Sequence, residues 1–490
     1  MSKPTLCVTV TAPTTAELRR LRDTVEDADL IELRLDSVSD PSVQGALAGR
    51  RRPVIVTCRP KWEGGSFEGS EEERKQILAD ALTHGAEYVD IEWRAHFDDL
   101  ISHSGGRRVV LSSHDFLGLP VDLNERVHAM KSTGAEVVKV AATMTCLSDC
   151  VQLLDLGAQA GRETGLILIG MGEYGLATRV LAGRFGSSWT YAGALAQLGQ
   201  IDAATLLGRY RFRKIDSQTE VYGLVGSPIA HSVSPAMHNA AFEAARVNAV
   251  YLPLPATSAE DFARFGRAIG ISGASVTVPY KVSLFDHVDE AYSVARRVGA
   301  INTIRVENRR WIGGNTDASG FLATLRGLVP IDTTRSAVLG AGGAARAVAA
   351  ALASTGGAVR IHARNRAKAE EVAALTTANV GPWPPEPGSW DLLINCTPIG
   401  MHPKVDETPV PAAQLTGRYV YDLIYNPPMT RLLREAQAAG CHIIGGLEML
   451  VAQAHEQFQW WTGIRPPTGV MREAALKQLA EFSRDEHHLI

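Results

Sequence analysis

The sequence predicts an α/β protein of two domains: an N-terminal (β/α)8 TIM barrel and a C-terminal two-lobed unit containing a Rossmann nucleotide-binding domain. Three observations support this fold class. The chain has 490 residues, which is too long for a single hydrophobic core. Short β-rich runs alternate with helical stretches eight times in the first half of the chain. A glycine-rich turn between a strand and a helix follows in the second half.

The composition is that of a soluble globular protein, with 45% hydrophobic and 21% charged residues. A net charge of −4 gives no reason to expect nucleic acid or a membrane surface as a partner. No apolar run approaches the ~20 residues of a membrane span, and the opening MSKPTLCVTV lacks a signal-peptide pattern. Six cysteines, none spaced as a zinc site, predict reduced thiols in the cytoplasm and no metal centre.

The β-rich runs of the first half predict parallel strands, because a helical stretch separates each run from the next. Eight such strands favour a closed barrel, with an open doubly wound sheet as the alternative. One connecting helix is clear in SEEERKQILADALTHG (70–85), which has acids in its first turn and Gly85 as its stop. The predicted strands are residues 5–10, 30–36, 53–59, 88–93, 108–114, 137–142, 165–171 and 187–192.

Lys139 is unusual because it stands in VVKVAA (137–142), a run that is otherwise typical of a buried strand. Burying an unpaired charge costs several kcal/mol, and a desolvated lysine commonly responds by lowering its pKa toward neutrality. Such an amine is a nucleophile suited to forming a Schiff base with a ketone. The alternative is a lysine at a strand end whose ammonium group reaches solvent.

Polar side chains gather where the predicted strands end, and chemistry in a TIM barrel takes place at that face. Arg34, Arg59 and Arg179 predict an anionic substrate, since guanidinium groups bind carboxylates in a bidentate manner. His114 is a candidate general base. Taken singly, each of these residues would more often be structural. The strand-end set comprises Glu32, Arg34, Arg59, Asp90, Glu92, His114, Lys139, Met171 and Gly172.

Five motifs in the first half resemble those of type I 3-dehydroquinate dehydratases, over about residues 5–205: ELRLD (32–36), TCRPKWEGG (57–65), SSHDF (112–116), VVKVAATM (137–144) and MGEYGLATRVLAGRFGS (171–187). The resemblance implies that Lys139 forms a Schiff base with the substrate. It also implies that His114 removes the α-proton and then protonates the departing hydroxyl, while Glu63 orients His114. The implied substrate contacts are Glu32, Arg34, Arg59, Arg179 and Gln200.

One segment departs from that family. A serine usually stands shortly before a PGQ motif near the last strand, whereas this chain has the shortened ALAQLGQI (194–201). Gln200 is therefore matched and the serine is not. The segment after it, 203–220, begins as a helix and then becomes polar and basic, with Arg209, Arg211, Arg213 and Lys214. A solvated linker is favoured there over an anion site, which predicts a barrel domain of residues 1–214 and a second domain of 220–490.

The second domain begins with a strand, VYGLVG (221–226), followed by a loop and a helix. GASVTVPYK (273–281) is a further strand that ends at Lys281, and the hairpin TIRVENRRWIGGNTD (303–317) ends at Asp317. A helix from about Leu447 has an apolar stripe that predicts core packing.

A nucleotide site is predicted at the turn in SAVLGAGGAARAVAAAL (336–352). The glycines of this turn allow a pyrophosphate to approach the helix N-terminus, and 359–373 supplies the next strand and helix. Where an NAD enzyme would place an acid at the end of that next strand, the chain has Arg364, with Arg366 and Lys368 close behind. This basic cluster favours the 2′-phosphate of NADP over NAD. Residues 391–401 and 419–427 predict further strands.

The second domain resembles the shikimate dehydrogenases over about residues 220–480. The shared motifs are GSPIAHSVSPAMHNAAF, SVTVPYK, GAINT, GNTDASG, GAGGAAR, INCTPIGM, YDLIYNP and GGLEMLVAQA. The resemblance implies that Lys281 and Asp317 form the acid–base pair. The implied substrate contacts are Ser232, Ser234, Thr277, Asn302, Tyr425 and Gln453. The implied NADP(H) contacts are Gly340, Ala341, Gly342, Gly343, Ala344, Arg364, Asn365, Lys368, Thr397, Leu423 and Gly446.

The two resemblances together predict a bifunctional enzyme, a lyase and an oxidoreductase, of the shikimate pathway toward aromatic amino acids. It would dehydrate 3-dehydroquinate to 3-dehydroshikimate and reduce the product to shikimate with NADPH. The second domain would comprise a substrate lobe (220–325), an NADP lobe (330–445) and C-terminal helices (446–490). Two alternatives stay open: the second domain acts as a quinate dehydrogenase, or the chain is a catalytically silent sensor of quinate-type ligands.

Overall fold

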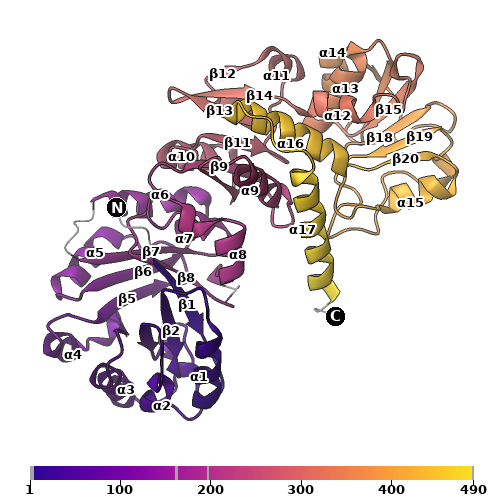
Figure 1. Cartoon of the computed structure of the whole chain (residues 1–490). Coiled ribbons are helices and arrows are strands. Elements are labelled where there is room, and N and C mark those ends of the chain that lie inside the picture. The colour runs from indigo at the N-terminus through magenta and orange to yellow at the C-terminus, as the bar shows by residue number, and fades with distance from the viewer. Residues whose placement is uncertain (1–4, 160–163, 196–197, 488–490) are drawn as a thin grey trace. The chain divides into compact units, whose positions relative to one another are not determined.

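The structure is a computed structural model that describes residues 5–159, 164–195 and 198–487, and side chains only as far as residue 484. The described chain divides into two compact units. The first contains all described residues up to Thr219, and the second contains most of those from Glu220 onward. Figure 1 shows both units with most of their helices and strands labelled.

The first unit is a parallel barrel, as predicted. Its described residues form an eight-stranded sheet in the order β7-β6-β5-β4-β3-β2-β1-β8, and each neighbouring pair is parallel. All eight predicted strands are confirmed, with limits that differ by up to two residues at either end. The strands are β1 (Thr5–Val10), β2 (Leu30–Arg34), β3 (Val54–Thr57), β4 (Tyr88–Glu92), β5 (Val109–Asp115), β6 (Val137–Thr143), β7 (Gly165–Met171) and β8 (Trp189–Ala192).

The barrel differs from the predicted closed one at a single seam, between β7 and β8. These strands are not neighbours in the hydrogen-bonded sheet of the described residues, so β8 is joined to the sheet through β1. The seam is bridged by local contacts instead: the Ser188 amide donates to the Leu166 carbonyl at 2.7 Å, and the Leu168 amide donates to Ser187 Oγ at 2.9 Å. The barrel is therefore nearly closed, and serine contacts complete its wall.

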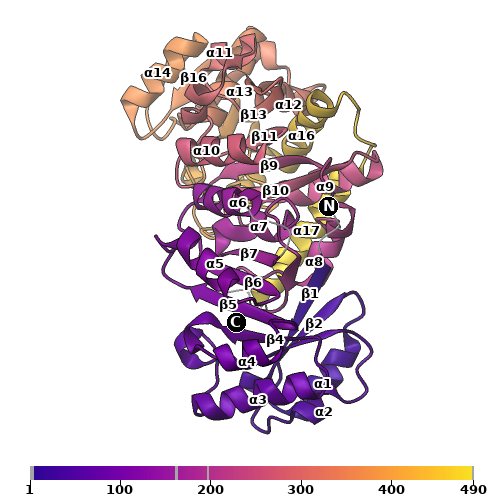
Figure 2. The ribbon, with the colours of Figure 1, turned by 90° about the vertical axis from the view of Figure 1, so that its left-hand side faces the viewer.

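Helices follow the strands and cover the outside of the barrel, as Figure 2 shows. The helix predicted at 70–85 is α3 (Glu71–Thr83), and Ser70 and Glu73 form a capping box at its start. Gly85 follows its end with φ +83°, a conformation that favours glycine. The other helices are α1 (Thr15–Thr24), α2 (Val43–Leu47), α4 (Asp98–His103), α5 (Leu123–Ser132), α6 (Cys150–Gln159), α7 (Leu176–Val180) and α8 (Ala203–Gly208).

The second unit begins with a mixed sheet in the order β10-β9-β11-β13-β14-β12. The predicted hairpin is confirmed as β13 and β14, which pair antiparallel around Asn308 and Arg309. Both turn residues have positive φ (49° and 65°), as a type I′ hairpin turn requires. The strands are β9 (Glu220–Gly226), β10 (Ala249–Pro255), β11 (Gly273–Val276), β12 (Glu290–Ala291), β13 (Thr303–Glu307) and β14 (Arg310–Gly314). The helices are α9 (Ser234–Ala244), α10 (Ala259–Ile269), α11 (Ser293–Val298) and α12 (Asp317–Leu325).

A parallel sheet in the order β17-β16-β15-β18-β19-β20 follows, with α13 and α14 on one face and α15 on the other (Figure 1). Alternate residues of the strands supply the two core layers, so that Val338 packs toward α13 and Leu339 toward α15. The strand order reverses beside β15, which is where such sheets bind ligands. The elements are β15 (Arg335–Leu339), α13 (Gly343–Ser354), β16 (Ala358–His362), α14 (Arg366–Thr376), β17 (Asn379–Val380), β18 (Leu392–Asn395), β19 (Tyr419–Asp422), α15 (Arg431–Ala438) and β20 (His442–Ile444).

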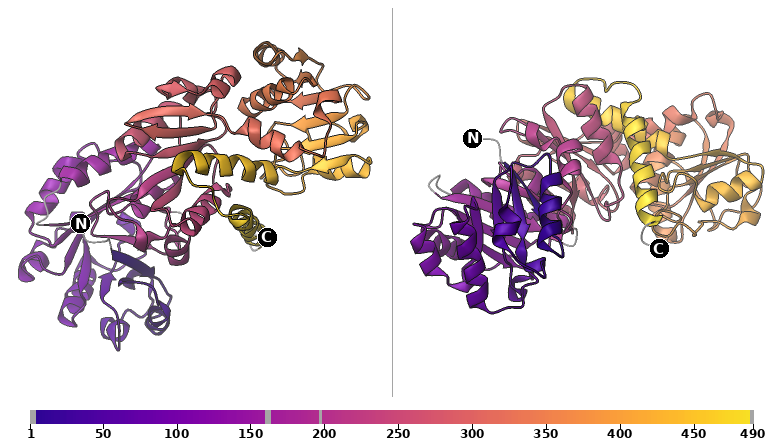
Figure 3. Two further views of the ribbon diagram at one scale, coloured as in Figure 1. Left: turned by 45° about the horizontal axis from the view of Figure 1, so that its top comes forward. Right: turned by 60° about the horizontal axis from the view of Figure 1, so that its bottom comes forward.

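One long helix contributes to the cores of both lobes of the second unit. The helix predicted from Leu447 is α16 (Leu447–Thr462), which runs along both lobes, as Figure 3 shows; α17 (Val470–His487) follows it. Met449 packs into the core of the parallel sheet, and Phe458 packs into the core of the mixed sheet. Phe321 of α12 also packs into the parallel-sheet core, so α12 contributes to the lobe that follows it in sequence. In the part of the chain that the structure describes, no helix combines the length and apolar character needed to cross a bilayer.

Candidate active sites

The first candidate site is a cavity of about 530 Å³, open solvent included, inside the barrel. It collects the predicted site residues of the first half, which lie far apart in sequence and come from different strands. Its lining is Glu32, Arg34, Arg59, Glu63, Gly64, His114, Phe116, Lys139, Ala141, Ile169, Met171, Arg179, Tyr191, Leu195, Leu198 and Gln200.

Lys139 lies in the cavity and is buried, but its charge is paired. It is the third residue of β6 rather than the last, so the prediction of a strand-end position was wrong. Its Nζ atom donates to Asp90 Oδ2 at 3.1 Å and lies 4.3 Å from the centroid of the Tyr191 ring. Asp90 is on β4, two strands away, and the expectation of an unpaired ammonium is therefore corrected. An amine beside one carboxylate and one aromatic face faces the cavity as a potential nucleophile.

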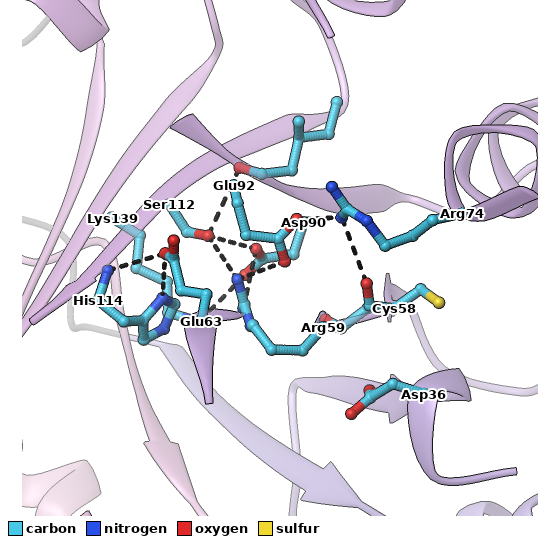
Figure 4. Close-up of polar contacts among 12 residues, drawn as sticks. Asp36, Cys58, Arg59, Glu63, Arg74, Asp90, Glu92, Ser112, His114 and Lys139 are labelled. Carbon is cyan, nitrogen blue, oxygen red and sulfur yellow. Dashed lines mark hydrogen bonds and ion pairs between the residues drawn. The ribbon is translucent and has the colours of Figure 1, made fainter. Parts of the chain in front are cut away.

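Asp90 belongs to a buried polar network, drawn in Figure 4. Arg59 pairs with Asp90 at 2.9 Å and with Glu92 at 2.7 Å, and it donates to Ser112 Oγ at 2.8 Å. Burial acts to raise the pKa of Asp90, but Arg59 and Lys139 outweigh burial and hold that pKa below its usual range. Asp90 therefore stays ionised beside the lysine.

His114 and Glu63 form a second pair at the cavity. Both the backbone amide and Nδ1 of His114 lie close to Glu63 Oε1, at 2.9 and 3.0 Å. Burial lowers the pKa of His114 well below its usual value, with Arg59 and Lys139 adding to the effect. Burial also raises the pKa of Glu63 to about 7. A neutral imidazole held at Nδ1 leaves Nε2 as the basic nitrogen, which suits a general base.

The arginines of the cavity differ in how their charges are balanced. Arg34 forms two hydrogen bonds to Asp36, at 2.7 and 2.8 Å, and Arg59 holds the acids described above. Arg179 is 3% exposed, and the contacts of the described residues give it no acidic partner, only the Leu198 carbonyl at 2.8 Å. Burial lowers the pKa of Arg179 to about 10. A buried cation without a counter-ion is a site for an anionic ligand group.

Two further predicted contacts have different surroundings. Glu32 is buried and accepts hydrogen bonds from Thr9 at 2.7 Å and Thr57 at 2.8 Å, so its carboxylate is held in place. Gln200 lines the cavity, and its Oε1 accepts from the Leu195 amide at 3.3 Å. Residues 196–197 of the shortened segment ALAQLGQI (194–201), where the family's serine is missing, lie outside the described residues.

The second candidate site is a cavity of about 1460 Å³, open solvent included, within the second unit. Lys281 and Asp317 face each other in it as an ion pair. Asn302 donates to Asp317 Oδ1 at 2.9 Å and to Gln453 Oε1 at 3.2 Å. Four predicted residues therefore converge, from the loop after β11, the position just before β13, the start of α12 and the middle of α16, with Thr277 also in the lining. An ammonium held by a fixed carboxylate is a suitable proton donor.

Ser232, Ser234 and Tyr425 border the same cavity. The Ser234 amide donates to Ser232 Oγ at 3.3 Å. Burial raises the pKa of Tyr425, partly offset by its hydrogen bond with Ser232. These hydroxyl groups form a neutral, hydrogen-bonding patch on the lining, which fits a ligand carboxylate or hydroxyl group.

The glycine-rich turn fits a dinucleotide. Gly340 adopts φ +108° at the end of β15, and a Cβ atom on Gly342 would meet nothing within 4 Å. The helix α13 then starts at Gly343 with its N-terminal amide groups free to bind phosphate. Ala344, Thr397, Leu423 and Gly446 line the cavity beside this turn.

The basic cluster after β16 is exposed. No ion pair or hydrogen bond of the described residues occupies the Arg364 or Lys368 side chain, whereas Arg366 pairs with Glu370 at 3.0 Å. Asn365 has a structural role as well: its side chain accepts from the Lys368 amide and caps α14. A guanidinium and an ammonium beside the second strand of the sheet suit a 2′-phosphate.

Sequence reasoning missed several participants. Asp90 and Glu92 were identified only as polar residues near a strand end, without partners. Ser112 was named only as part of the motif SSHDF, and Arg74 was given no role. The alternation of β4, with Asp90 and Glu92 on one face, was the available signal for two inward carboxylates. Gln457 was also missed; its amide links Ser275 Oγ, at 2.6 Å, to the Asn302 carbonyl, at 2.9 Å.

Comparisons with known proteins agree with this division. Family models match for type I 3-dehydroquinase over residues 6–217, the shikimate dehydrogenase substrate binding domain over 224–304, and the shikimate 5'-dehydrogenase C-terminal domain over 446–476. A chloroplastic bifunctional 3-dehydroquinate dehydratase/shikimate dehydrogenase of Arabidopsis thaliana is 34% identical over 90% of this chain and 78% of that protein.

Relatives of the second unit alone are also similar. The shikimate dehydrogenase (NADP(+)) of Methanopyrus kandleri is 42% identical over 54% of this chain and 98% of that protein. The crystal structure of a shikimate dehydrogenase in complex with NADP+ has a TM-score of 0.51 and 36% identity, over 54% of this chain and 97% of that chain. The similarity to known enzymes therefore reaches both units.

Proposed function

Since the chain belongs to the family of bifunctional 3-dehydroquinate dehydratase/shikimate dehydrogenases, we propose which of its residues carry out each of the two reactions. The enzyme dehydrates 3-dehydroquinate to 3-dehydroshikimate and reduces 3-dehydroshikimate to shikimate with NADPH, two steps of the shikimate pathway. The dehydration belongs to the barrel cavity, and the reduction belongs to the cavity of the second unit.

Lys139 is the proposed nucleophile of the dehydration. Its amine adds to the ketone carbon of 3-dehydroquinate and releases water, which leaves a protonated imine. The imine withdraws electrons from the neighbouring C–H bond, so a base as weak as imidazole can remove that proton. Asp90, 3.1 Å from Nζ, holds the lysine side chain toward the cavity and stabilises the cationic imine.

His114 is the proposed acid–base group. Its Nε2 atom removes the proton next to the imine, and the resulting enamine expels the hydroxyl on the following carbon, which takes the same proton and leaves as water. Hydrolysis of the imine then restores the lysine. Glu63, 3.0 Å from Nδ1, fixes the tautomer and orientation of the ring.

Arg179 is the proposed partner of the substrate carboxylate. Its support is its burial at the cavity wall, together with contacts in the described chain that include the Leu198 carbonyl and no acidic group. Arg34 and Arg59, whose charges are already balanced by acids, and Glu32 and Gln200 complete the substrate contacts.

The observation that carries the dehydratase assignment is the pairing of buried Lys139 with Asp90 in the same cavity as the His114–Glu63 pair. Borohydride added with 3-dehydroquinate should link the substrate covalently to Lys139, as peptide mass spectrometry would show. Label that persists in Lys139→Met would reject Lys139 as the imine-forming residue. Lys131→Met, which changes a lysine on the outer helix α5, is the matched control and should be trapped like the parent.

In the second unit, Lys281 is proposed to protonate the carbonyl oxygen of 3-dehydroshikimate as it becomes a hydroxyl. Asp317 holds the ammonium in place, and solvent returns the lost proton to the amine. Bound NADPH supplies the hydride. Ser232 and Ser234 would hold the substrate carboxylate, and Thr277, Asn302, Tyr425 and Gln453 would hold the ring. Supplying purified enzyme with 3-dehydroquinate and NADPH should yield shikimate; activity with quinate and NADP+ in place of shikimate would instead favour a quinate dehydrogenase.

NADP(H) is the cofactor of this family's dehydrogenases. The proposed contacts are the turn Gly340–Ala344 for the pyrophosphate, Arg364, Asn365 and Lys368 for the 2′-phosphate, and Thr397, Leu423 and Gly446 near the nicotinamide. Two observations support this placement of NADP(H). There is open space at Gly342, and no ion pair or hydrogen bond of the described residues occupies the side chains of Arg364 and Lys368.

The proposed domain limits are 1–214 for the barrel, 220–325 and 330–445 for the two lobes, and 446–490 for the C-terminal helices. The division of the described chain near Thr219 supports the first limit. A cytoplasmic location is also proposed, since all six cysteines are free thiols, which suits a reducing compartment. Cell fractionation tests it, and the chloroplastic relative shows that the compartment differs within the family.

A further inference from the structure

Arg74 lies outside the lining of the barrel cavity, yet it contacts the supports of both catalytic groups there. It is the fourth residue of α3, and its side chain is 0% exposed. In Figure 4 it lies beyond Glu92, on the far side from Lys139. A fully buried guanidinium on an outer helix is costly unless its hydrogen bonds are satisfied, so its partners are informative.

The first set of contacts leads to Lys139. Arg74 forms an ion pair with buried Glu92, and Glu92 also binds Arg59. Arg59 in turn holds Asp90 at 2.9 Å, and Asp90 accepts from Lys139 Nζ at 3.1 Å. Positive and negative groups therefore alternate from α3 to the nucleophile, and each carboxylate is shared by two cations.

The second set of contacts leads to His114. Arg74 Nε donates to Glu71 at 3.0 Å, and the Trp62 indole donates to the other oxygen of Glu71, also at 3.0 Å. The Arg74 guanidinium also lies 5.8 Å from the centroid of the Trp62 ring. Trp62 immediately precedes Glu63 in the short 3-10 helix Lys61–Glu63. Arg74 and Glu71 thus hold the turn whose carboxylate orients His114.

We propose that Arg74 is a positioning residue of the dehydratase reaction: through Glu92 it sets Asp90 and Lys139, and through Trp62 it sets Glu63 and His114. This inference rests on the proposed dehydratase function. Without the Arg74 charge, Glu92 competes with Asp90 for Arg59, and the field at the cavity becomes more negative. The titratable groups of the cavity are then protonated more easily. The turn that carries Glu63 also loses the contacts of Arg74 with Glu71 and Trp62.

The decisive comparison is Arg74→Met against Arg74→Lys and Arg22→Met. Arg22 is the matched control: it is 2% exposed on α1, and it donates to the Ala46 and Ala48 carbonyls and to Asp23, away from the cavity. The dehydrogenase activity of the same chain measures the amount of enzyme in each variant, and thermal unfolding followed by circular dichroism checks that the barrel itself is folded.

In Arg74→Met, kcat for dehydration should fall by about 10- to 100-fold with KM changed little, as expected when supporting contacts of a site are lost. The acidic limb of the pH–rate profile should move upward by about one pH unit, since a nearby cation has been removed. Borohydride trapping at Lys139 should slow in parallel. Arg74→Lys keeps a positive charge beside Glu92 but loses the guanidinium contacts with Glu71 and Trp62. The acidic limb should therefore return to its position in the parent enzyme, while kcat recovers only in part.

Three results would overturn the proposal: an unchanged kcat and pH limb in Arg74→Met, a kinetic loss no larger than that of Arg22→Met, or an Arg74→Lys limb as displaced as that of Arg74→Met. If Arg74→Met does not fold, Arg74→Lys decides alone, and parent-level kcat in it rejects a positioning role. Absence of trapping at Lys139 in the parent enzyme would instead reject the proposed function, so the two failures are distinguishable.

Discussion

At the scale of single residues, all but one of the cationic side chains that line the barrel cavity are paired with a carboxylate. Lys139 has Asp90, Arg34 has Asp36, and Arg59 has Asp90 and Glu92. Arg179 has no such partner among the contacts of the described chain, and burial lowers its pKa to about 10. Arg179 is therefore the arginine that we propose to bind the substrate carboxylate, and this contact would hold the substrate in one orientation in the cavity.

The Glu63–His114 pair has a testable pH dependence. Burial raises the pKa of Glu63 to about 7, so its carboxylate form, which accepts from His114 Nδ1, prevails only above that pH. The kcat/KM for dehydration should therefore rise through about pH 7 and stay level above it. Glu63→Gln should lose about 10²-fold in rate and show no ionisation near pH 7. If the rise in kcat/KM near pH 7 persists in Glu63→Gln, a group other than Glu63 is responsible for it.

Arg364 should determine the choice between NADPH and NADH. Arg364→Ala should raise KM for NADPH by about 10- to 100-fold and leave KM for NADH nearly unchanged, because a charged hydrogen bond to the 2′-phosphate is lost. Arg366→Ala is the matched control, since Arg366 is occupied by Glu370. Equal effects of the two substitutions on the NADPH/NADH ratio would contradict a specific role for Arg364.

Which residues carry charge into the cavity could be predicted from the sequence, but not how those charges are paired. Arg34 and Asp36 stand two positions apart in ELRLD, so their pairing was within reach of local reasoning. Asp90 and Lys139 are 49 positions apart in sequence, and β5 lies between their strands. Their contact depends on the curvature of the barrel, which hydrophobic periodicity does not encode, and so the lysine was expected to be unpaired.

At the scale of elements, the start of α13 serves two purposes. A Cβ atom on Gly342 would meet nothing within 4 Å, which leaves room for a pyrophosphate. A Cβ atom on Gly343 would lie 2.7 Å from Lys281 Cβ and 3.1 Å from its Cδ. The absence of a side chain at Gly343 therefore makes room for Lys281 of the other lobe, whereas the sequence pattern suggested that both glycines serve the cofactor.

The two glycines should differ when changed to alanine. Gly343→Ala displaces the Lys281 side chain, so kcat for reduction should fall by about 10-fold or more with KM for NADPH changed little. Gly342→Ala fills ligand space, so KM for NADPH should rise while kcat is nearly kept. Steady-state kinetics with varied NADPH measures both. If Gly343→Ala changed only KM for NADPH, Gly343 would make room for the cofactor and not for Lys281.

The strands and the glycine-rich turn were predictable because each produces a local pattern of apolar residues, glycines and helix caps. The seam between β7 and β8 was not. Both strands were identified correctly, but whether they pair depends on how far the remaining strands have curved around. The packing of α12 against the parallel sheet was missed for a similar reason, since its apolar face does not reveal which core it joins.

At the scale of the whole molecule, each cavity is lined by residues of a single unit. The two reactions should then respond separately to mutation. Lys281→Ala should reduce turnover of the dehydrogenase by about 10²–10⁴-fold and leave the dehydratase unchanged, and Lys139→Met should do the reverse. Separate assays of each half-reaction measure this. Parallel loss of both activities in either variant would show that the sites depend on one another.

The pairing of β8 with β1 has a consequence for the order in which this protein can be made. Within the barrel, β1 is the first strand to be synthesised and β8 is the last, yet Thr5 is paired with Trp189. Tyr191, whose ring covers Lys139, is on β8, so the site cannot be assembled until the ribosome has passed Ala192. The 298 residues from there to residue 490 require roughly 15–60 s at ordinary elongation rates. That interval lets the barrel close while the second unit is still being synthesised.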